Sequence, residues 1–433
     1  MNSRKKRFKL LGTPILFLVL ITVQTLVLGP KNWTASYLAQ ALIINTLILI
    51  GIYAFRGLEF DKSVNMNSCF VSFLVGTVAG SLLAMIPLLI FFKPRLPQLL
   101  FISTILTAAV INPILFCFSM KIMIKSIPVK RFLVIGKKKE IEPLFKEIEE
   151  KSMGKIQAYM YMNPSALALE REITLEPAFD QILIADPKLE KTVEPQIQQA
   201  KKEGIEIDYL PNLVENYLKR IPMEMAIKFK EYYEIAFDSV EDSPAKRVLD
   251  VFISGISLII LLPVMLFVAL WILIEDGRPV IFKQERIGKD GKPFIMHKFR
   301  SMKNIKEECA KFVTDEQHRI LNIGKFMRPI RLDETPQFWD ILTGKMSFIG
   351  PRPEQVNFVK EYNEKIPFYS DRHRLKTGLT GWAQITYQYA ASREETAKKL
   401  SYDLYYIKNR NTLFDLRIIL QTLEAVVWKK GAK

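Results

Sequence analysis

Histidine and cysteine are scarce in this chain. Each occurs only three times among 433 residues. The cysteines, Cys69, Cys117 and Cys309, lie far apart and form no CxxC pair, which argues against a disulfide framework or a zinc site. We expect each thiol to be a small buried apolar group. With three histidines, a histidine-rich metal site is not expected either.

Acidic residues are also in deficit. The chain has 45 Asp and Glu against 61 Lys and Arg, which gives a net charge of +16. Such a balance favours anionic partners: nucleic acid, anionic lipid or phosphorylated substrates. Nucleic-acid binding is not predicted, because the recognition motifs are missing and long apolar segments lie in the same chain.

Hydrophobic residues make up 49% of the chain and are concentrated near its N-terminus. Four apolar runs, at roughly 10–29, 38–55, 69–92 and 99–120, are each long enough to span a bilayer as a helix. Basic clusters precede the first run and follow the fourth, so we expect the N-terminus and residue 121 to be cytoplasmic. The first run is too long for a cleaved signal peptide and lacks a cleavage site. A transporter or receptor would place charged residues inside these runs, which are nearly free of charge.

The stretch after these runs alternates between strand-like and helix-like segments. "RFLVIG", "KIQAYMYM", "QILIAD" and "IEIDYL" read as strands, and "KEIEPLFKEIEEK" and "VEPQIQQAKKEG" read as helices. This alternation predicts a parallel sheet in a Rossmann-like α/β domain over residues 126–236. Its first turn, "GKKKE", lacks the glycines of a dinucleotide-binding loop, so a structural or regulatory role is expected.

A fifth apolar run, residues 248–274, follows a boundary at 237–247. Pro263 lies in its middle, where a proline removes a helical hydrogen bond and bends the axis. Basic residues flank both ends of the run. A helix that enters the membrane, breaks at Pro263 and returns would keep both basic flanks on one side. The alternative is a fifth spanning helix with an external C-terminal domain.

"LDETPQFWDILTG" contains two adjacent carboxylates, Asp333 and Glu334. Pro336 suits the first turn of a helix and Gly344 suits the position just past its end. The pair would then precede a helix N-terminus, where negative charge is stabilised. An anionic Asp333 is a competent nucleophile, and Glu334 could hold Mg²⁺. Plain helix capping is the alternative.

Cations surround this carboxylate pair in the sequence. "MHKFRSM" supplies Lys298 and Arg300, "FMRPIRLDE" supplies Arg328 and Arg331, and "GPRPE" holds Arg352 between two prolines. Guanidinium groups bind phosphate oxygens bidentately. Several cations around a carboxylate–Mg²⁺ pair are typical of phosphoryl transfer.

Four motifs together, "FKQERIGKDGKPFIMHKFRSM", "LDETPQFWDILTGKMSFIGPRP", "TGLTGWAQI" and "DLYYIKN", resemble the bacterial sugar transferase family. These are the monotopic phosphoglycosyl transferases that start glycan assembly on polyprenyl phosphate. The resemblance covers about 246–433 in order and with matching spacing, and the N-terminal half looks like that of the large members. Thr377 occupies a position where the family usually has a proline. Arg319-Ile320-Leu321 occupies the position of the family's R-x-T motif and lacks its threonine.

The resemblance implies a mechanism and a set of roles. Asp333 would attack the β-phosphate of a UDP-sugar, releasing UMP, and polyprenyl (undecaprenyl) phosphate would then take the phosphosugar. Glu334 would bind Mg²⁺. Cations at the site, namely Lys298, Arg300, Arg328 and Arg352, would hold substrate phosphates. Pro263 would be the break in the re-entrant helix.

The resulting prediction is a membrane protein with a four-helix transmembrane bundle (1–125), the Rossmann-like module (126–236), a re-entrant membrane helix (246–275) and an α/β catalytic domain (276–433). It would lie in the bacterial inner (cytoplasmic) membrane as a multi-pass protein with its catalytic domain on the cytoplasmic face. It would catalyse the first membrane step of exopolysaccharide, capsule or O-antigen synthesis. Its partners would be a UDP-sugar, polyprenyl phosphate and membrane lipid, with a homodimer left open. The competing hypothesis is a non-catalytic membrane scaffold of a polysaccharide-assembly complex.

Overall fold

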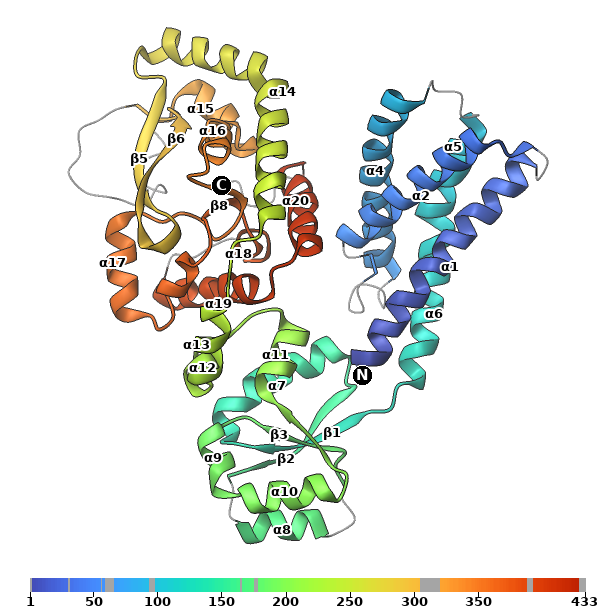
Figure 1. The fold of residues 1–433 in the computed structure, drawn as a ribbon, viewed down its shortest axis with the longest axis vertical. Helices are drawn as coiled ribbons and strands as arrows, with labels where there is room; N and C mark the ends of the chain where they lie inside the picture. Colours follow the sequence, from blue (N-terminus) through green and yellow to red (C-terminus); the bar gives the residue numbers. More distant parts are fainter. Residues whose placement is uncertain are drawn as a thin grey trace. The chain divides into compact units, whose positions relative to one another are not determined.

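The computed structural model describes residues 2–29, 32–55, 57–58, 66–92, 98–163, 166–174, 178–303, 320–387 and 392–427. Cys309 and Arg319 lie outside these ranges. Residue contacts divide the chain into two compact units, Met1–Tyr209 and Leu210–Lys433 (Figure 1).

Four apolar helices open the first unit, as the sequence predicts. They are α1 (Asn2–Leu28), α2 (Ala35–Ala54), α4 (Met66–Phe91) and a run made of α5 (Gln98–Leu106), a π-helical turn (Thr107–Ile111) and α6 (Asn112–Ser126). By length and composition, α2, α4 and the last run can each cross a membrane, and the apolar part of α1 is shorter. These helices fit a membrane protein.

The helical bundle packs around an apolar core with a small polar centre. Cys69 and Cys117 are buried in that core, which confirms the expectation for two of the three cysteines. The Gln24 side-chain amide donates hydrogen bonds to Asn45 Oδ1 at 3.0 Å and Thr104 Oγ1 at 2.9 Å. Polar groups inside a membrane bundle are stable when they bond across helices in this way.

A four-stranded parallel sheet follows the bundle in the chain, again as predicted. Its strand order is β2-β1-β3-β4. The strands are β1 (Lys130–Ile135), β2 (Ile156–Met162), β3 (Gln181–Ile184) and β4 (Glu206–Tyr209), and the helices are α7 (Lys138–Ser152), α8 (Ala166–Thr174), α9 (Pro187–Thr192) and α10 (Glu194–Lys202).

Helices cover both faces of this sheet (Figure 1). Leu133 and Ile135 of β1 share a core with residues of α8 and α10, such as Leu169 and Ile197. Phe132, on the other face of β1, contacts Phe145 of α7 with ring centroids 6.3 Å apart. Alternate residues of β1 therefore face opposite layers, which explains why the buried part of the strand, residues 132–135, is entirely apolar.

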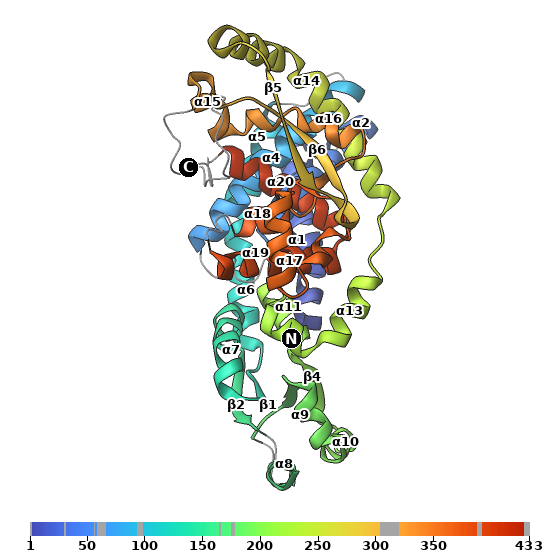
Figure 2. The ribbon, with the colours of Figure 1, turned by 90° about the vertical axis from the view of Figure 1, so that its left-hand side faces the viewer.

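The second unit carries the candidate catalytic residues. Its helices are α11 (Leu210–Leu218), α12 (Met223–Lys228), α13 (Lys230–Asp238), α14 (Pro244–Asp276), α15 (Asn322–Met327), α16 (Gln337–Leu342), α17 (Val356–Lys365), α18 (Trp382–Thr386), α19 (Arg393–Asn409) and α20 (Thr412–Val427). Strands β5 (Ile281–Ile287) and β6 (Pro293–Phe299) form an antiparallel hairpin (Figure 2), and β7 (Ser347–Ile349) pairs in parallel with β8 (Gly378–Thr380).

Helix α14 is bent, and both of its halves pack on this unit (Figure 1). Pro263 lies inside the helix. Before Pro263, Leu258 and Leu261 pack against a cluster of residues from β6 and α16. After it, Val268 and Ile272 are buried with a second cluster that includes residues of α15. Only 11% of the most apolar stretch of α14 is buried, so most of its apolar surface is open to other contacts.

Candidate active site

The carboxylate pair lies in a tight turn just ahead of α16. Asp333 and Glu334 belong to a 3₁₀ turn, Leu332–Glu334, that follows Arg331 in the left-handed conformation, φ 54°. Pro336 caps α16, and Gly344, with φ +84°, ends it in a conformation that favours glycine. The predicted order of carboxylates, proline, short helix and glycine is confirmed.

Glu334 is the electrostatic centre of the site. Its Oε1 accepts hydrogen bonds from Lys298 Nζ at 3.2 Å and from Arg352 Nη2 at 3.0 Å. Arg331 Nη1 lies 4.0 Å from Oε2. Burial alone would raise the pKa of Glu334, but Arg352, Lys298 and Arg331 hold it well below the ordinary value. Glu334 is therefore ionised at neutral pH although it is buried.

Asp333 has the opposite electrostatic behaviour. Burial and the neighbouring charge of Glu334 raise the pKa of Asp333, while Lys298 and Arg328 partly offset that rise. The sequence predicts that a helix N-terminus stabilises the Asp333 anion, but α16 has only six residues. Burial, which a sequence motif does not report, dominates instead.

Strand β6 brings Lys298 to the carboxylate pair. Beside it, the backbone N–H of His297 donates to Asp340 Oδ2 at 2.9 Å, and His297 Nδ1 lies 2.7 Å from Asp340 Oδ1. Asp340 belongs to α16 and is fully buried. This double contact fixes α16 against β6, so the Lys298–Glu334 pair is held by the fold.

The close approach of the backbone at Gly350, just after β7, to Gly378 of β8 positions Arg352. Gly350 donates its N–H to Thr380 O at 2.8 Å, and Gly378 donates to Pro351 O at 2.9 Å. A Cβ on Gly378 would collide with the backbone of Gly350. Strands β7 and β8 can therefore come this close only because both positions are glycine. The loop that follows β7 then directs Arg352 to Glu334.

The other predicted cations have different surroundings. Arg300 follows the end of β6, and its Nη2 donates to the carbonyls of Asp276 and Gly277 at 2.7 and 2.8 Å. It anchors the C-terminal end of α14 and does not contact the carboxylate pair among the described residues. Arg328 lies near enough to Asp333 to affect its pKa, and its Nη1 is buried without a described hydrogen-bond partner.

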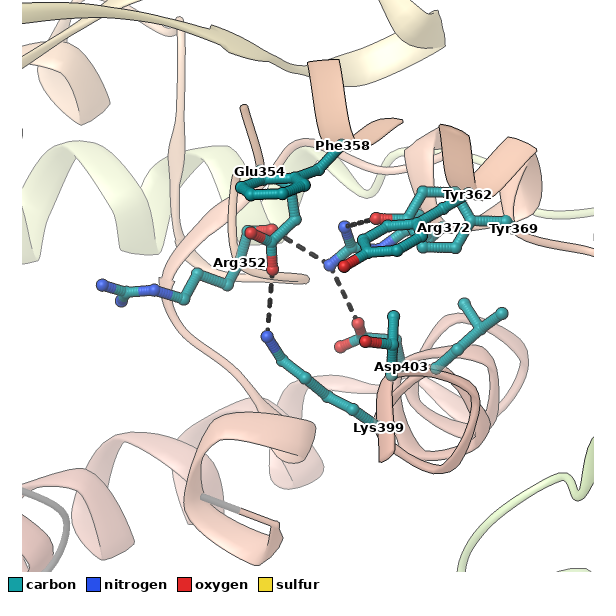
Figure 3. Close-up of a pocket in the computed structure, with 10 residues that line it drawn as sticks. Arg352, Glu354, Phe358, Tyr362, Tyr369, Arg372, Lys399 and Asp403 are labelled. Atoms are coloured by element: carbon teal, nitrogen blue, oxygen red, sulfur yellow. Dashed lines mark hydrogen bonds and ion pairs between the residues drawn. The ribbon is translucent and has the colours of Figure 1, made fainter. Parts of the chain in front are cut away.

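Several residues around the site were not proposed from the sequence. Arg286 and Gln337 join Lys298, Glu334 and Arg352 around a small polar pocket. A second, larger pocket of about 160 Å³ shares Arg352 with the first and contains two ion pairs, the half-buried Glu354–Lys399 pair and the buried Arg372–Asp403 pair (Figure 3). The members of each pair are more than 30 positions apart in the chain, so no local motif announces them.

The N-terminal end of α14 is also tied to this domain. Lys246 Nζ donates to Ile349 O at 2.6 Å, and Asp250 Oδ1 accepts from the backbone N–H of Phe348 at 2.8 Å. Arg247 donates to the carbonyls of Ile341 and Leu342, both at 2.7 Å. These contacts join α14 to β7 and to the end of α16, the elements that flank the carboxylate pair.

In the part of the chain that the structure describes, one oxygen of Glu334 has only the distant Arg331 guanidinium as a charged neighbour. Glu334 Oε2 is buried and has no hydrogen-bond partner among the described residues. Within that same part of the chain, no group of three or more His, Cys, Asp or Glu side chains could hold a metal ion. Mg²⁺ fits such a sparse site, because it commonly takes one or two carboxylates and completes its shell with water and substrate phosphates.

A carboxylate pair set among cations therefore lies on a domain that carries a long exposed apolar helix. The family described as "Bacterial sugar transferase" matches residues 241–429. An exopolysaccharide production protein of Rhizobium leguminosarum bv. phaseoli is 37% identical over 192 residues, which are 42% of this chain and 94% of that protein. The chain belongs to the bacterial sugar transferase family, as the sequence motifs suggested.

Two relatives that are longer than the Rhizobium protein carry names that specify a reaction. The UDP-N-acetylgalactosamine-undecaprenyl-phosphate N-acetylgalactosaminephosphotransferase of Aeromonas hydrophila is 39% identical over 212 residues, 48% of this chain and 50% of that protein. The UDP-glucose:undecaprenyl-phosphate glucose-1-phosphate transferase of Escherichia coli (strain K12) is 38% identical over 181 residues, 41% of this chain and 39% of that protein. The chain thus matches half or less of the length of these two.

Proposed function

We propose that the protein transfers a sugar-1-phosphate from a UDP-sugar to undecaprenyl phosphate and releases UMP, in the first membrane step of exopolysaccharide, capsule or O-antigen synthesis. The observation that carries the proposal is a half-buried Asp333 beside a buried Glu334 that two cations hold ionised. The names of the Aeromonas and E. coli relatives support this reaction class.

The reaction would run in two displacements at one phosphorus. An Asp333 carboxylate oxygen attacks the β-phosphorus of the UDP-sugar, and the bond from that phosphorus to the bridging oxygen breaks. UMP leaves with the bridging oxygen, and the phosphosugar remains as an acyl phosphate on Asp333. A phosphate oxygen of undecaprenyl phosphate then attacks the same phosphorus, forms the diphosphate and restores the Asp333 carboxylate.

The chain's cations would orient the phosphates during both displacements. Lys298 and Arg352 already converge on Glu334, and Arg328 has a buried Nη1 available for a phosphate oxygen. Positive groups fixed before the reaction stabilise the charge that develops on the transferred phosphoryl group. Glu334 would hold Mg²⁺ through Oε2, and the ion would supply further charge neutralisation at the phosphates.

The membrane arrangement of α14 is part of the proposal: the helix enters and leaves the membrane on the cytoplasmic side. A straight helix of its 33 residues would be about 50 Å long and would place its ends on opposite sides of a bilayer. Here Lys246 at one end and Asp276 at the other both bind the same domain. The bend near the middle supports a re-entrant path, with the active site at the surface where the lipid-linked acceptor lies.

Cysteine accessibility in intact cells tests this topology. We expect a membrane-impermeant maleimide to label Lys31→Cys, in the first predicted external loop, and not Glu364→Cys, which is exposed on α17. Both variants carry Cys309→Ser to remove a native thiol. Permeabilised cells should show labelling of Glu364→Cys as well. Labelling of Glu364→Cys in intact cells would mean that α14 crosses the membrane.

Pro263→Ala restores a helical hydrogen bond and should straighten α14. We therefore expect this substitution to make Glu364→Cys accessible to the maleimide in part of the population of intact cells.

The pKa of Asp333 predicts the pH dependence of the first displacement. Only the carboxylate can attack, and burial together with Glu334 raises the pKa of Asp333. The rate of UMP release should therefore fall as pH is lowered, with a midpoint above that of an ordinary aspartate. A higher Mg²⁺ concentration should move this midpoint to lower pH, because a cation at Glu334 favours the neighbouring anion. A midpoint at or below the ordinary aspartate value would contradict the assignment.

The reaction class is tested by UMP release from a panel of UDP-sugars, with purified protein, Mg²⁺ and undecaprenyl phosphate. The panel includes UDP-glucose, UDP-galactose and N-acetylated sugars, because the relatives' names differ in their sugar. We expect UMP from one of them. UDP in place of UMP would indicate ordinary glycosyl transfer. No nucleotide release from any donor would favour the non-catalytic scaffold.

A further inference from the structure

The 160 Å³ pocket beside the Arg352 loop has its own chemistry. Glu354 binds Lys399 at 3.0 Å, and Asp403 binds Arg372 at 3.0 Å. The third basic residue of the lining, Arg352, pairs with Glu334, which lies outside this pocket. Lys399 and Arg372 help lower the pKa of Glu354 to about 2, although burial alone would raise it. A pocket whose charged groups already have ion-pair partners is poorly suited to an isolated phosphate.

Aromatic rings form one wall of this pocket (Figure 3). Phe358 and Tyr362, one turn apart on α17, are stacked with an interplanar angle of 13° and centroids 6.0 Å apart. Tyr362 in turn contacts Tyr369 with centroids 5.3 Å apart. Flat aromatic surfaces of this kind bind planar rings by stacking, with little dependence on charge.

A buried donor accompanies the aromatic wall. Arg372 lines the pocket, is 2% exposed, and donates to Tyr369 Oη, Arg352 O and Asp403 Oδ2, each at 3.0 Å. Its Nε is buried and has no hydrogen-bond partner in the part of the chain that the structure describes. Buried polar atoms are normally paired, so an orphaned donor next to a cavity suggests an acceptor on a ligand.

Arg352 connects this pocket to the carboxylate pair. In Figure 3 its side chain extends away from the centre of the pocket. Its Nη2 reaches Glu334 Oε1 at 3.0 Å, and Arg352 belongs to the linings of both pockets. A ligand with phosphates at Lys298 and Arg352 could therefore continue along the Arg352 loop into the aromatic pocket.

We propose that this pocket binds the nucleobase of the donor. The inference rests on the proposed function, because it places the base of the proposed UDP-sugar donor in this pocket. The donor's sugar is attached directly to the phosphorus that Asp333 attacks, so it must lie next to Asp333, which does not line this pocket. The base is the planar, uncharged end that lies farthest from the reacting phosphorus. The pocket is smaller than the roughly 300–1,000 Å³ of whole drug-sized ligand sites, so it suits a single-ring base better than a purine.

The first test is equilibrium binding of UDP and ADP, neither of which carries the transferred sugar on its β-phosphate, to the purified full-length protein. We expect the wild type to bind UDP at least about tenfold more tightly than ADP. Phe358→Ala removes one face of the stacked wall from a half-buried position and should weaken UDP binding by about tenfold or more. Phe358→Tyr should restore most of that affinity. The matched control, Asn357→Ala, changes the adjacent exposed residue of α17 and should bind UDP like the wild type.

Steady-state kinetics separate this role from a general loss of structure. Phe358→Ala should raise the KM for the UDP-sugar by about tenfold with a much smaller change in kcat, because stacking on the base is made before and during the reaction alike. An unchanged UDP affinity with an altered preference among UDP-sugars would place the sugar in this pocket and overturn the inference. Equal binding of ADP and UDP would overturn it too. If the wild type neither binds UDP nor releases UMP, the proposed function itself fails. If it does both and Phe358→Ala is unaffected, only the pocket assignment fails.

Discussion

Asp333→Asn should abolish UMP release, with a loss of at least about 10⁴-fold, the scale seen when a catalytic nucleophile is removed. Asparagine keeps the size of the side chain but offers no anionic oxygen for attack on phosphorus. Asp333 is half-buried, and its pKa is already raised, so replacing it with a neutral group should disturb the fold little. Glu334 should remain paired with Lys298 and Arg352 in this variant.

Isotope exchange makes this prediction specific to a covalent intermediate. Without undecaprenyl phosphate, the wild type should exchange labelled UMP into the UDP-sugar, because formation of the Asp333 acyl phosphate is reversible. Asp333→Asn should show no exchange. Asp290→Asn is a matched control, because Asp290 is exposed in the β5–β6 turn at φ 55°, a conformation that asparagine tolerates. Turnover by the wild type without exchange would mean that the acceptor attacks the donor directly.

Local sequence was sufficient to predict the carboxylate pair and its nearest cations. Asp333, Glu334, Lys298 and Arg352 belong to compact motifs, and three of the four contact one another through Glu334. Spacing also placed the short helix after the pair, because proline and glycine act on the backbone within a few residues. The parallel sheet and the apolar helices could also be predicted, because strand–helix alternation and long apolar runs are local features of the sequence.

What the sequence could not supply depends on tertiary contacts. Arg300 is two residues from Lys298, yet its guanidinium binds the end of α14 because the chain turns away at the end of β6. The Arg372–Asp403 pair joins a turn to a distant helix. The pKa of Asp333 is raised mainly because burial disfavours its charged form, and only the folded chain determines that burial. Motifs therefore identified the chemical groups, and packing decided which of them meet.

Glu334→Gln is the second variant with a large expected effect. The substitution removes the charge that holds Lys298 and Arg352, each of which donates to Oε1. Removing one partner of a buried ion pair typically costs about 3–5 kcal/mol, which corresponds to a rate loss of about 10²- to 5 × 10³-fold if Lys298 and Arg352 are no longer held in the orientation that Glu334 gives them. The Mg²⁺ concentration for half-maximal UMP release should rise by about 100-fold or more, because the carboxamide is a weak ligand for Mg²⁺.

The pH profile of the residual activity distinguishes this effect from simple unfolding. The charge of Glu334 is one of the causes that raise the pKa of Asp333. With that charge removed, and Lys298 and Arg328 still nearby, the midpoint of the acid limb should move to lower pH. Glu361→Gln, which breaks an exposed ion pair with Lys365 on α17, should leave the midpoint and the Mg²⁺ dependence unchanged. A Glu334→Gln enzyme with the wild-type Mg²⁺ dependence would remove Glu334 from the proposed metal site, and an unmoved midpoint would show that Asp333 does not sense its charge.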